Sequence, residues 1–143
     1  MRRRSFLGLL AGVAAATTVR AEDSRKATLY KNPQCGCCED YASYLRKAGF
    51  QVAVVATHDL DAVKAQHHVP QNLYGCHTTL VGGYVVEGHV PASTIERLLQ
   101  ERPRIRGVSL PGMPLGSPGM TGPKTEPFRI LEIGPEQRVY AVE

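Results

Sequence analysis

The sequence has no apolar run long enough to cross a membrane, no internal repeat and, once its first residues are set aside, no net charge. The apolar run near its start covers residues 7–19, whereas a membrane-spanning helix needs roughly 20 residues. Residues 1–21 hold four arginines and no acidic residue, so the formal charge of +4 belongs to them. The rest of the chain has 13 basic and 13 acidic side chains. A neutral chain has no electrostatic basis for binding nucleic acid.

The first residues have the features of an export signal. The segment Arg3-Arg4-Ser5-Phe6-Leu7 resembles the twin-arginine export pattern, and Val19-Arg20-Ala21 is a suitable cleavage site. The alternative, an uncleaved anchor, is disfavoured by the short apolar run. We therefore predict that residues 1–21 are an export signal and that the protein is periplasmic, with no membrane attachment after cleavage. About 122 residues then remain, which suits one domain.

Cysteine is scarce but clustered, because three of the four cysteines fall within four residues, at Cys35, Cys37 and Cys38. The apolar segment 27–31 before them predicts a strand, and the pattern after them predicts a helix from residue 35 or 36 to Ala48, ended by Gly49. The cysteines thus lie at a helix N-terminus, which favours thiolate over thiol.

The remaining pattern predicts an α/β fold. We expect a buried strand over 50–56, parallel to the first, then a helix over 60–67 with Leu60, Val63 and His67 on one face, and a loop over 71–75. Strands 78–81 and 84–87 form a hairpin around Gly82-Gly83, and a helix covers 91–102. The order β-α-β-α-β-β-α is that of a thioredoxin-like domain, predicted here over residues 22–102.

The C-terminal part, 103–143, has a different composition. Residues 103–127 hold six prolines and five glycines, which argues against a helix or an interior strand. We expect a Pro/Gly-rich arm here, followed by a short hairpin of 128–133 and 138–143, packed on the same domain.

The cysteine cluster allows two kinds of chemistry. Cys35 and Cys38 form a C-x-x-C pair, which alone suggests thiol–disulfide exchange with Cys35 as the nucleophile. Cys37 complicates that function, because a third thiol invites scrambling. Three adjacent thiolates suit a soft cation, and Cu(I) fits better than zinc, whose sites usually space their ligands in two separate pairs. Structural disulfides are a third possibility, which the clustering disfavours.

Cys76 and His77 lie just before the third predicted strand, in a loop that faces the C-x-x-C end of a thioredoxin-like domain. No proline stands between Pro70 and Pro91, so the usual cis-proline of that loop is missing. We predict that Cys76 joins the cluster as a ligand or redox partner and that His77 supports it. The alternatives are a packing role for Cys76 and a solvated or structural His77.

The arm carries both methionines outside the export segment, Met113 and Met120, each after a Pro-Gly pair. Their thioethers are soft donors and therefore candidate copper ligands. The alternative is that they pack the arm onto the domain. His58, His67 and His68 lie around the second predicted helix, and we predict that His67 and His68 are at the surface or its edge. His89 is predicted to have a structural role.

Four motifs stand in order between Tyr30 and Met120: Tyr-Lys-Asn-Pro before Cys-x-Cys-Cys, Gly-Cys-His-Thr, Gly-Tyr-x-x-Glu-Gly-His-Val-Pro-Ala and Leu-Pro-Gly-Met-Pro-x-Gly-Ser-Pro-Gly-Met. Together they resemble the CopG-like proteins, a family of exported bacterial copper-handling proteins. The resemblance implies a thioredoxin-like fold, periplasmic copper resistance and a cysteine-bound copper site that can hold several ions. The tail after Met120 lies outside it.

The expected function is thus copper binding for sequestration, transfer or conversion between Cu(I) and Cu(II). Whether the protein is an enzyme, a copper oxidoreductase, stays open. The expected partners are copper ions and periplasmic copper efflux or carrier proteins. The alternative is a thiol–disulfide oxidoreductase acting through Cys35 and Cys38.

Overall fold

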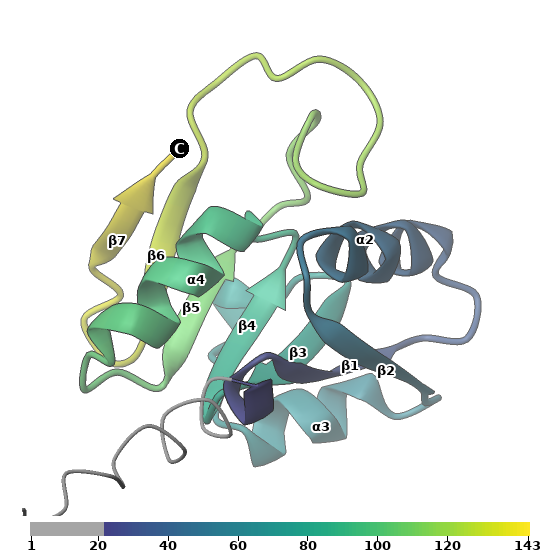
Figure 1. Ribbon diagram of the computed structural model, residues 1–143, viewed down its shortest axis with the longest axis horizontal. Helices are drawn as coiled ribbons and strands as arrows, with labels where there is room; N and C mark the ends of the chain where they lie inside the picture. Colours follow the sequence, from purple (N-terminus) through teal and green to yellow (C-terminus); the bar gives the residue numbers. More distant parts are fainter. Residues whose placement is uncertain (1–21) are drawn as a thin grey trace, which may run out of the picture.

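Seven strands form one sheet, in the order β2-β1-β3-β4-β5-β6-β7, across the residues that the computed structural model describes, 22–143 (Figure 1). The predicted export signal, residues 1–21, lies outside this described part. The strands are β1 (Lys26–Lys31), β2 (Gln51–Ala56), β3 (His77–Val81), β4 (Tyr84–Gly88), β5 (Gly107–Leu110), β6 (Arg129–Ile133) and β7 (Val139–Val142).

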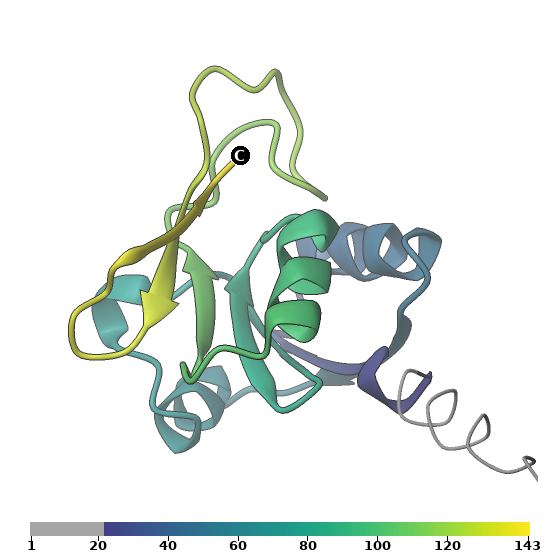
Figure 2. The ribbon, with the colours of Figure 1, turned by 60° about the vertical axis from the view of Figure 1, so that its left-hand side comes forward.

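Helices cover both faces of this sheet. Helices α2 (Gly36–Lys47) and α4 (Ala92–Glu101) lie on one face and α3 (Leu60–Gln66) on the other, as Figures 1 and 2 show. The larger core lies under α2 and α4 and includes Leu29, Leu45 and Ile95. A smaller cluster on the opposite face contains Leu73 from the short 3₁₀ helix η1 (Gln71–Leu73), together with Val85.

Helix α2 forms where the sequence predicts it. Cys38, Tyr41, Ala42 and Leu45 recur at helical spacing and are all buried, so the helix has one apolar face against the sheet. Gly49 follows with φ +93°, a conformation that glycine adopts without strain, and it ends the helix. The prediction for this segment is confirmed.

The order of elements and the mixed α/β class are confirmed. Strand β1 pairs in parallel with β2 and antiparallel with β3, and β3 pairs antiparallel with β4. Gly82 and Gly83 join β3 to β4, both with positive φ, as a two-residue hairpin requires. The hairpin β6–β7 also forms as expected and extends the same sheet.

The expectation that residues 50–56 form a buried strand is wrong. Strand β2 is the first strand of the sheet, so it has a neighbour on one side only, and its residues are exposed or half-buried. Val55 is 39% exposed. The Arg46 side chain from α2 donates hydrogen bonds to the Val52 carbonyl, from Nη2 at 2.8 Å and from Nε at 3.3 Å.

The exclusion of an interior strand from residues 103–127 is also wrong. Strand β5 lies within this segment, parallel to β4 on one side and antiparallel to β6 on the other. Gly107 makes the pairing possible, because a Cβ at this position would lie 1.8 Å from the Val85 carbonyl oxygen.

Helix α3 buries a different residue from those expected. Leu60, Val63 and His67 are only half-buried, whereas Lys64 is the buried residue of the helix. Asp59 caps the start of this helix, where its carboxylate accepts the Ala62 backbone N–H at 3.2 Å. Among residues 22–143, none of the helices is long and apolar enough to span a bilayer.

Candidate metal centre

The candidate residues meet at one end of the central strands. Strand β1 ends at Lys31, whose register partner on β3 is His77, so the start of α2 and the start of β3 are neighbours. Glu87 near the end of β4 pairs with Thr78 of β3, which brings His89 to the same end. Residues far apart in sequence therefore converge where β1 and β4 end and β3 begins.

The four sulfur atoms form one group, with all of them within 4.8 Å of one another. Cys37 Sγ lies 3.5 Å from Cys35 Sγ and 3.8 Å from Cys76 Sγ. The Cys38 side chain is fully buried, and the other three cysteine side chains are half-buried. The structure thus brings Cys76 to the Cys-x-Cys-Cys turn, as the sequence predicts, while its role as a ligand stays a prediction.

Cys35 and Cys38 are joined by a disulfide, which leaves Cys37 and Cys76 as free thiols. In this form two sulfurs are bonded to each other and are not available as thiolates. A metal site with four thiolate donors would therefore require this pair to be reduced.

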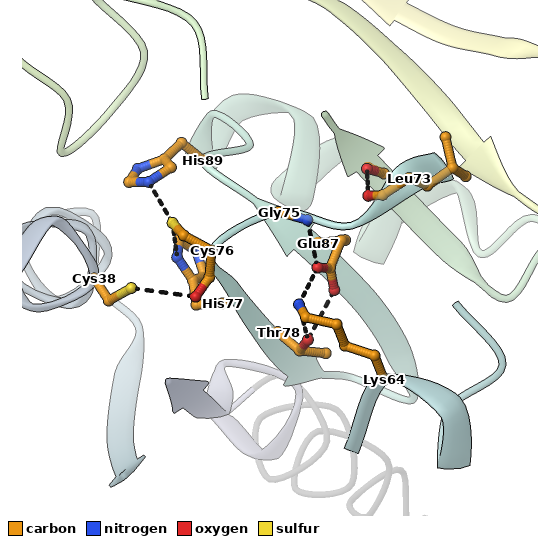
Figure 3. A network of polar contacts seen from close by, with 10 residues as sticks. Cys38, Lys64, Leu73, Gly75, Cys76, His77, Thr78, Glu87 and His89 are labelled. Atoms are coloured by element: carbon orange, nitrogen blue, oxygen red, sulfur yellow. Dashed lines mark hydrogen bonds and ion pairs between the residues drawn. The ribbon is translucent and has the colours of Figure 1, made fainter. Parts of the chain in front are cut away.

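Two histidines extend the sulfur group on the side of Cys76. Cys76 Sγ lies 3.3 Å from His77 Nδ1 and 3.0 Å from His89 Nε2, and these three residues form a second candidate group of metal ligands (Figure 3). Of the other histidines, His58 is exposed, and His67 and His68 are half-buried and exposed, in line with their predicted place at the surface or its edge.

His89 is the residue of this group that sequence reasoning missed. Its Nδ1 lies 2.6 Å from the Pro118 carbonyl oxygen, which can only accept, so Nδ1 carries the proton and Nε2 presents its lone pair to Cys76. The contact to Pro118 is structural, as expected for His89, but it also orients a donor atom. Its place directly after a strand was the available signal.

Burial sets the protonation states of these groups. It raises the pKa of the Cys76 thiol to about 12, with Cys37 acting in the same direction and Lys64 against it. Burial also lowers the pKa of His77 to about 3 and lowers that of His89. Near neutral pH the free site therefore has neutral imidazoles, which can bind a metal, and a Cys76 thiol that must lose its proton to do so.

Tyr41 of α2 fixes the two imidazole rings from one side. Its ring centroid lies 4.5 Å from that of His77 and 5.3 Å from that of His89, and its hydroxyl donates to the Val90 carbonyl at 2.7 Å. Burial raises its pKa well above the usual value, so it stays a phenol. Gly119 of the arm rests on Tyr41, and a Cβ there would lie 2.7 Å from the Tyr41 backbone nitrogen.

The two methionines have different positions on the arm. Met113 is 43% exposed, whereas Met120 is half-buried and directly follows Gly119, which packs on α2. Their predicted thioether ligation stays a prediction.

A second lysine with little exposure supports the start of α2. The side chain of Lys31 is 5% exposed, and its Nζ donates to the Cys35 carbonyl at 3.1 Å while pairing with Glu39 at 3.0 Å. This holds the turn that carries the first cysteine against the end of β1.

The fold and site define a mixed α/β protein with a candidate metal centre of four cysteines and two histidines at one end of its sheet. A family profile described as "Protein of unknown function, DUF411" matches residues 73–120, the stretch from η1 to Met120. No curated protein sequence matches the chain.

Two solved structures, of "Copper resistance protein copG" in Form 2 and Form 1, are similar to this chain, each at 36% sequence identity with a TM-score of 0.73. The matches cover 82% of this chain, and 94% and 93% of those chains, respectively. The chain belongs to the CopG family, and the resemblance found in its motifs is confirmed.

Proposed function

We propose that this protein handles copper for copper resistance and that the reduced cluster of Cys35, Cys37, Cys38 and Cys76 binds Cu(I). The observation that carries the proposal is the grouping of four sulfurs within 4.8 Å in a member of the CopG family. Thiolates are soft ligands and select Cu(I), and adjacent sulfurs can bridge more than one ion.

The neighbouring nitrogen donors extend the function to redox conversion. His77 and His89 lie against Cys76, and imidazole suits Cu(II) as well as other borderline metals. A site with sulfur on one side and nitrogen on the other can hold copper in both oxidation states. Met113 and Met120 are further thioether donors in this proposal.

The predicted export signal supports a periplasmic place for this activity. A twin-arginine precursor folds before export, so its thiols are reduced when the fold forms. The protein partners expected there are copper efflux or carrier proteins, which would deliver or accept the ion.

Competition between metals tests the proposal. Titrate the fully reduced chain lacking residues 1–21 with Cu(I) and with Zn(II), each against a chelator of known affinity, and measure what stays bound after dialysis. We expect Cu(I) to bind more tightly than Zn(II). The matched control is the same protein with the Cys35–Cys38 disulfide intact, which should bind less Cu(I) because two sulfurs are blocked. A preference for zinc, or equal Cu(I) binding by both forms, would contradict the proposal.

A second candidate function is thiol–disulfide exchange, favoured by the Cys35–Cys38 disulfide at the start of α2. Two observations disfavour it. Cys37 Sγ lies 3.5 Å from Cys35 Sγ, so a third thiol can attack the pair and scramble it. The loop that carries Cys76 also has no proline, so it lacks the cis-proline that thioredoxin-like exchange proteins usually have there. We expect weak turnover in an insulin-reduction assay. Turnover comparable to that of a dedicated thioredoxin would make exchange the primary function.

A further inference from the structure

A buried ion pair lies beside the candidate metal centre and outside its two groups of candidate ligands. The side chains of Lys64 on α3 and Glu87 on β4 are 2% and 0% exposed, and Lys64 Nζ contacts Glu87 Oε1 (Figure 3). Lys64 is the buried residue of its helix. Removing two charges from water costs free energy that their mutual attraction often does not offset. A contribution to stability therefore does not by itself explain why this pair is buried.

The Glu87 carboxylate holds the segment that carries Cys76 and His77 at both of its ends. Oε1 accepts the Gly75 backbone N–H at 2.7 Å, and Oε2 accepts the Thr78 hydroxyl at 2.8 Å. The two candidate ligands are therefore the residues between the two points of attachment. Lys64 Nζ also donates to Thr78 Oγ1 at 3.0 Å, so each member of the network contacts the other two.

The backbone leaves little freedom for this segment to settle elsewhere. Gly75 lies so close to β4 that a Cβ there would be 2.7 Å from Gly88 Cα. A segment fixed in this way presents its side chains in one direction, toward the Cys-x-Cys-Cys turn and toward His89.

We propose that Lys64, Glu87 and Thr78 form a positioning network that holds Cys76 and His77 in place to bind metal. None of the hydrogen bonds within residues 22–143 joins these three residues to a candidate donor atom; their bonds hold Gly75 and Thr78, on either side of the two ligands. The inference rests on the proposed copper site. It also explains why the charged side chains of Lys64 and Glu87 are buried. Groups that orient metal ligands commonly change metal affinity about 10- to 100-fold when they are lost.

The test compares two neutral replacements of the ion pair. Lys64→Met with Glu87→Leu removes both charges and leaves the Gly75 N–H without its acceptor. Lys64→Met with Glu87→Gln also removes both charges but keeps an amide oxygen that can accept that N–H. We expect the first variant to lose about 10- to 100-fold in Cu(I) affinity and the second to recover most of it. Ile130→Val, a change in the buried part of β6, is the control for a general loss of core packing.

A readout specific to positioning comes from combining these changes with Cys76→Ser. If the network acts through Cys76 and His77, its loss should cost much less affinity once Cys76 is already serine. Thr78→Val removes only one hydroxyl, so it serves as the second variant if the first does not fold, and it should also lower Cu(I) affinity. Circular dichroism reports folding in each case.

Two results would overturn the inference. The first is a Cu(I) affinity equal to that of the parent in the variant with Lys64→Met and Glu87→Leu or, if that variant does not fold, in Thr78→Val. The second is a loss of Cu(I) affinity from these changes that is as large in the Cys76→Ser background as in the parent. Failure of the proposed function is distinguishable, because the parent protein itself would then bind no Cu(I).

Discussion

Replacing Cys76 by serine separates a metal ligand from a packing residue. The change keeps the size of the side chain and removes its soft donor. Cys76 Sγ contacts Cys37 Sγ at 3.8 Å, His77 Nδ1 at 3.3 Å and His89 Nε2 at 3.0 Å, so within residues 22–143 it is the atom shared by the sulfur group and the group with the two imidazoles. We expect Cys76→Ser to lower Cu(I) affinity by at least about tenfold near neutral pH, or about 1.4 kcal/mol.

The pKa of this thiol also predicts how Cu(I) affinity changes with pH. Because the pKa of Cys76 is raised to about 12, the free thiol is protonated throughout the neutral range and must release one proton when it binds a metal. That proton alone makes affinity rise about tenfold per pH unit between about pH 6 and 8. Serine releases no proton here, so the slope of log affinity against pH should fall by about one in the variant.

The assay is Cu(I) competition against a chelator whose own proton affinities are known, repeated across that pH range with parent and variant. Ala141→Ser is the matched control, since it also introduces a half-buried hydroxyl but lies on β7, at the opposite edge of the sheet from β2. Circular dichroism checks that each protein is folded. Equal affinity and an unchanged pH slope would refute the reasoning and make Cys76 a packing residue.

Three further predictions concern other parts of the molecule. The unfolded chain protonates histidine near pH 6.5, whereas the pKa of His77 is lowered to about 3, so the free energy of unfolding should fall below about pH 6.5 by up to about 1.4 kcal/mol per pH unit. Urea unfolding should show less acid sensitivity in His77→Asn; equal sensitivity would contradict this. Gly119→Ala should lower the free energy of unfolding, measured by urea unfolding, by about 1–3 kcal/mol, and by more than Gly112→Ala does. Both glycines have positive φ, but only a Cβ at Gly119 would clash with the Tyr41 backbone. Changing Arg3 and Arg4 to Lys should leave the precursor in the cytoplasm on fractionation, and normal export would exclude the twin-arginine route.

Local pattern was enough to predict most of the elements. The face of α2 from Cys38 to Leu45 and the glycine hairpin between β3 and β4 are specified by neighbouring residues, so the sequence alone indicates them. The same local information predicts that the cysteines start a helix. The order of strands and helices then places Cys76 near these cysteines, because it decides which strand ends lie at the same end of the sheet.

What the sequence could not predict depends on partners distant in the chain. Lys64 looks like a solvated helix residue until Glu87, 23 residues away, is brought against it. The four residues of β5 stand between prolines and begin with a glycine, so no alternation marks them; only the neighbouring strands β4 and β6 make them a strand. The place of His89 directly after a strand puts it at the right end of the sheet, but the contact with Pro118 of the arm, which orients its ring toward Cys76, depends on the fold.

Arg46 covers part of one edge of the sheet, the edge formed by β2. A strand with one neighbour offers its unused backbone groups to any other extended chain, which is a common route to aggregation. On β2 the guanidinium of Arg46 already occupies the Val52 carbonyl. A strand from a second copy of this protein could pair with the Val52 carbonyl only by displacing the Arg46 side chain, and the positive charge of Arg46 would then lie beside that strand. The helix that begins with the cysteines therefore also protects, near its other end, the strand that follows it.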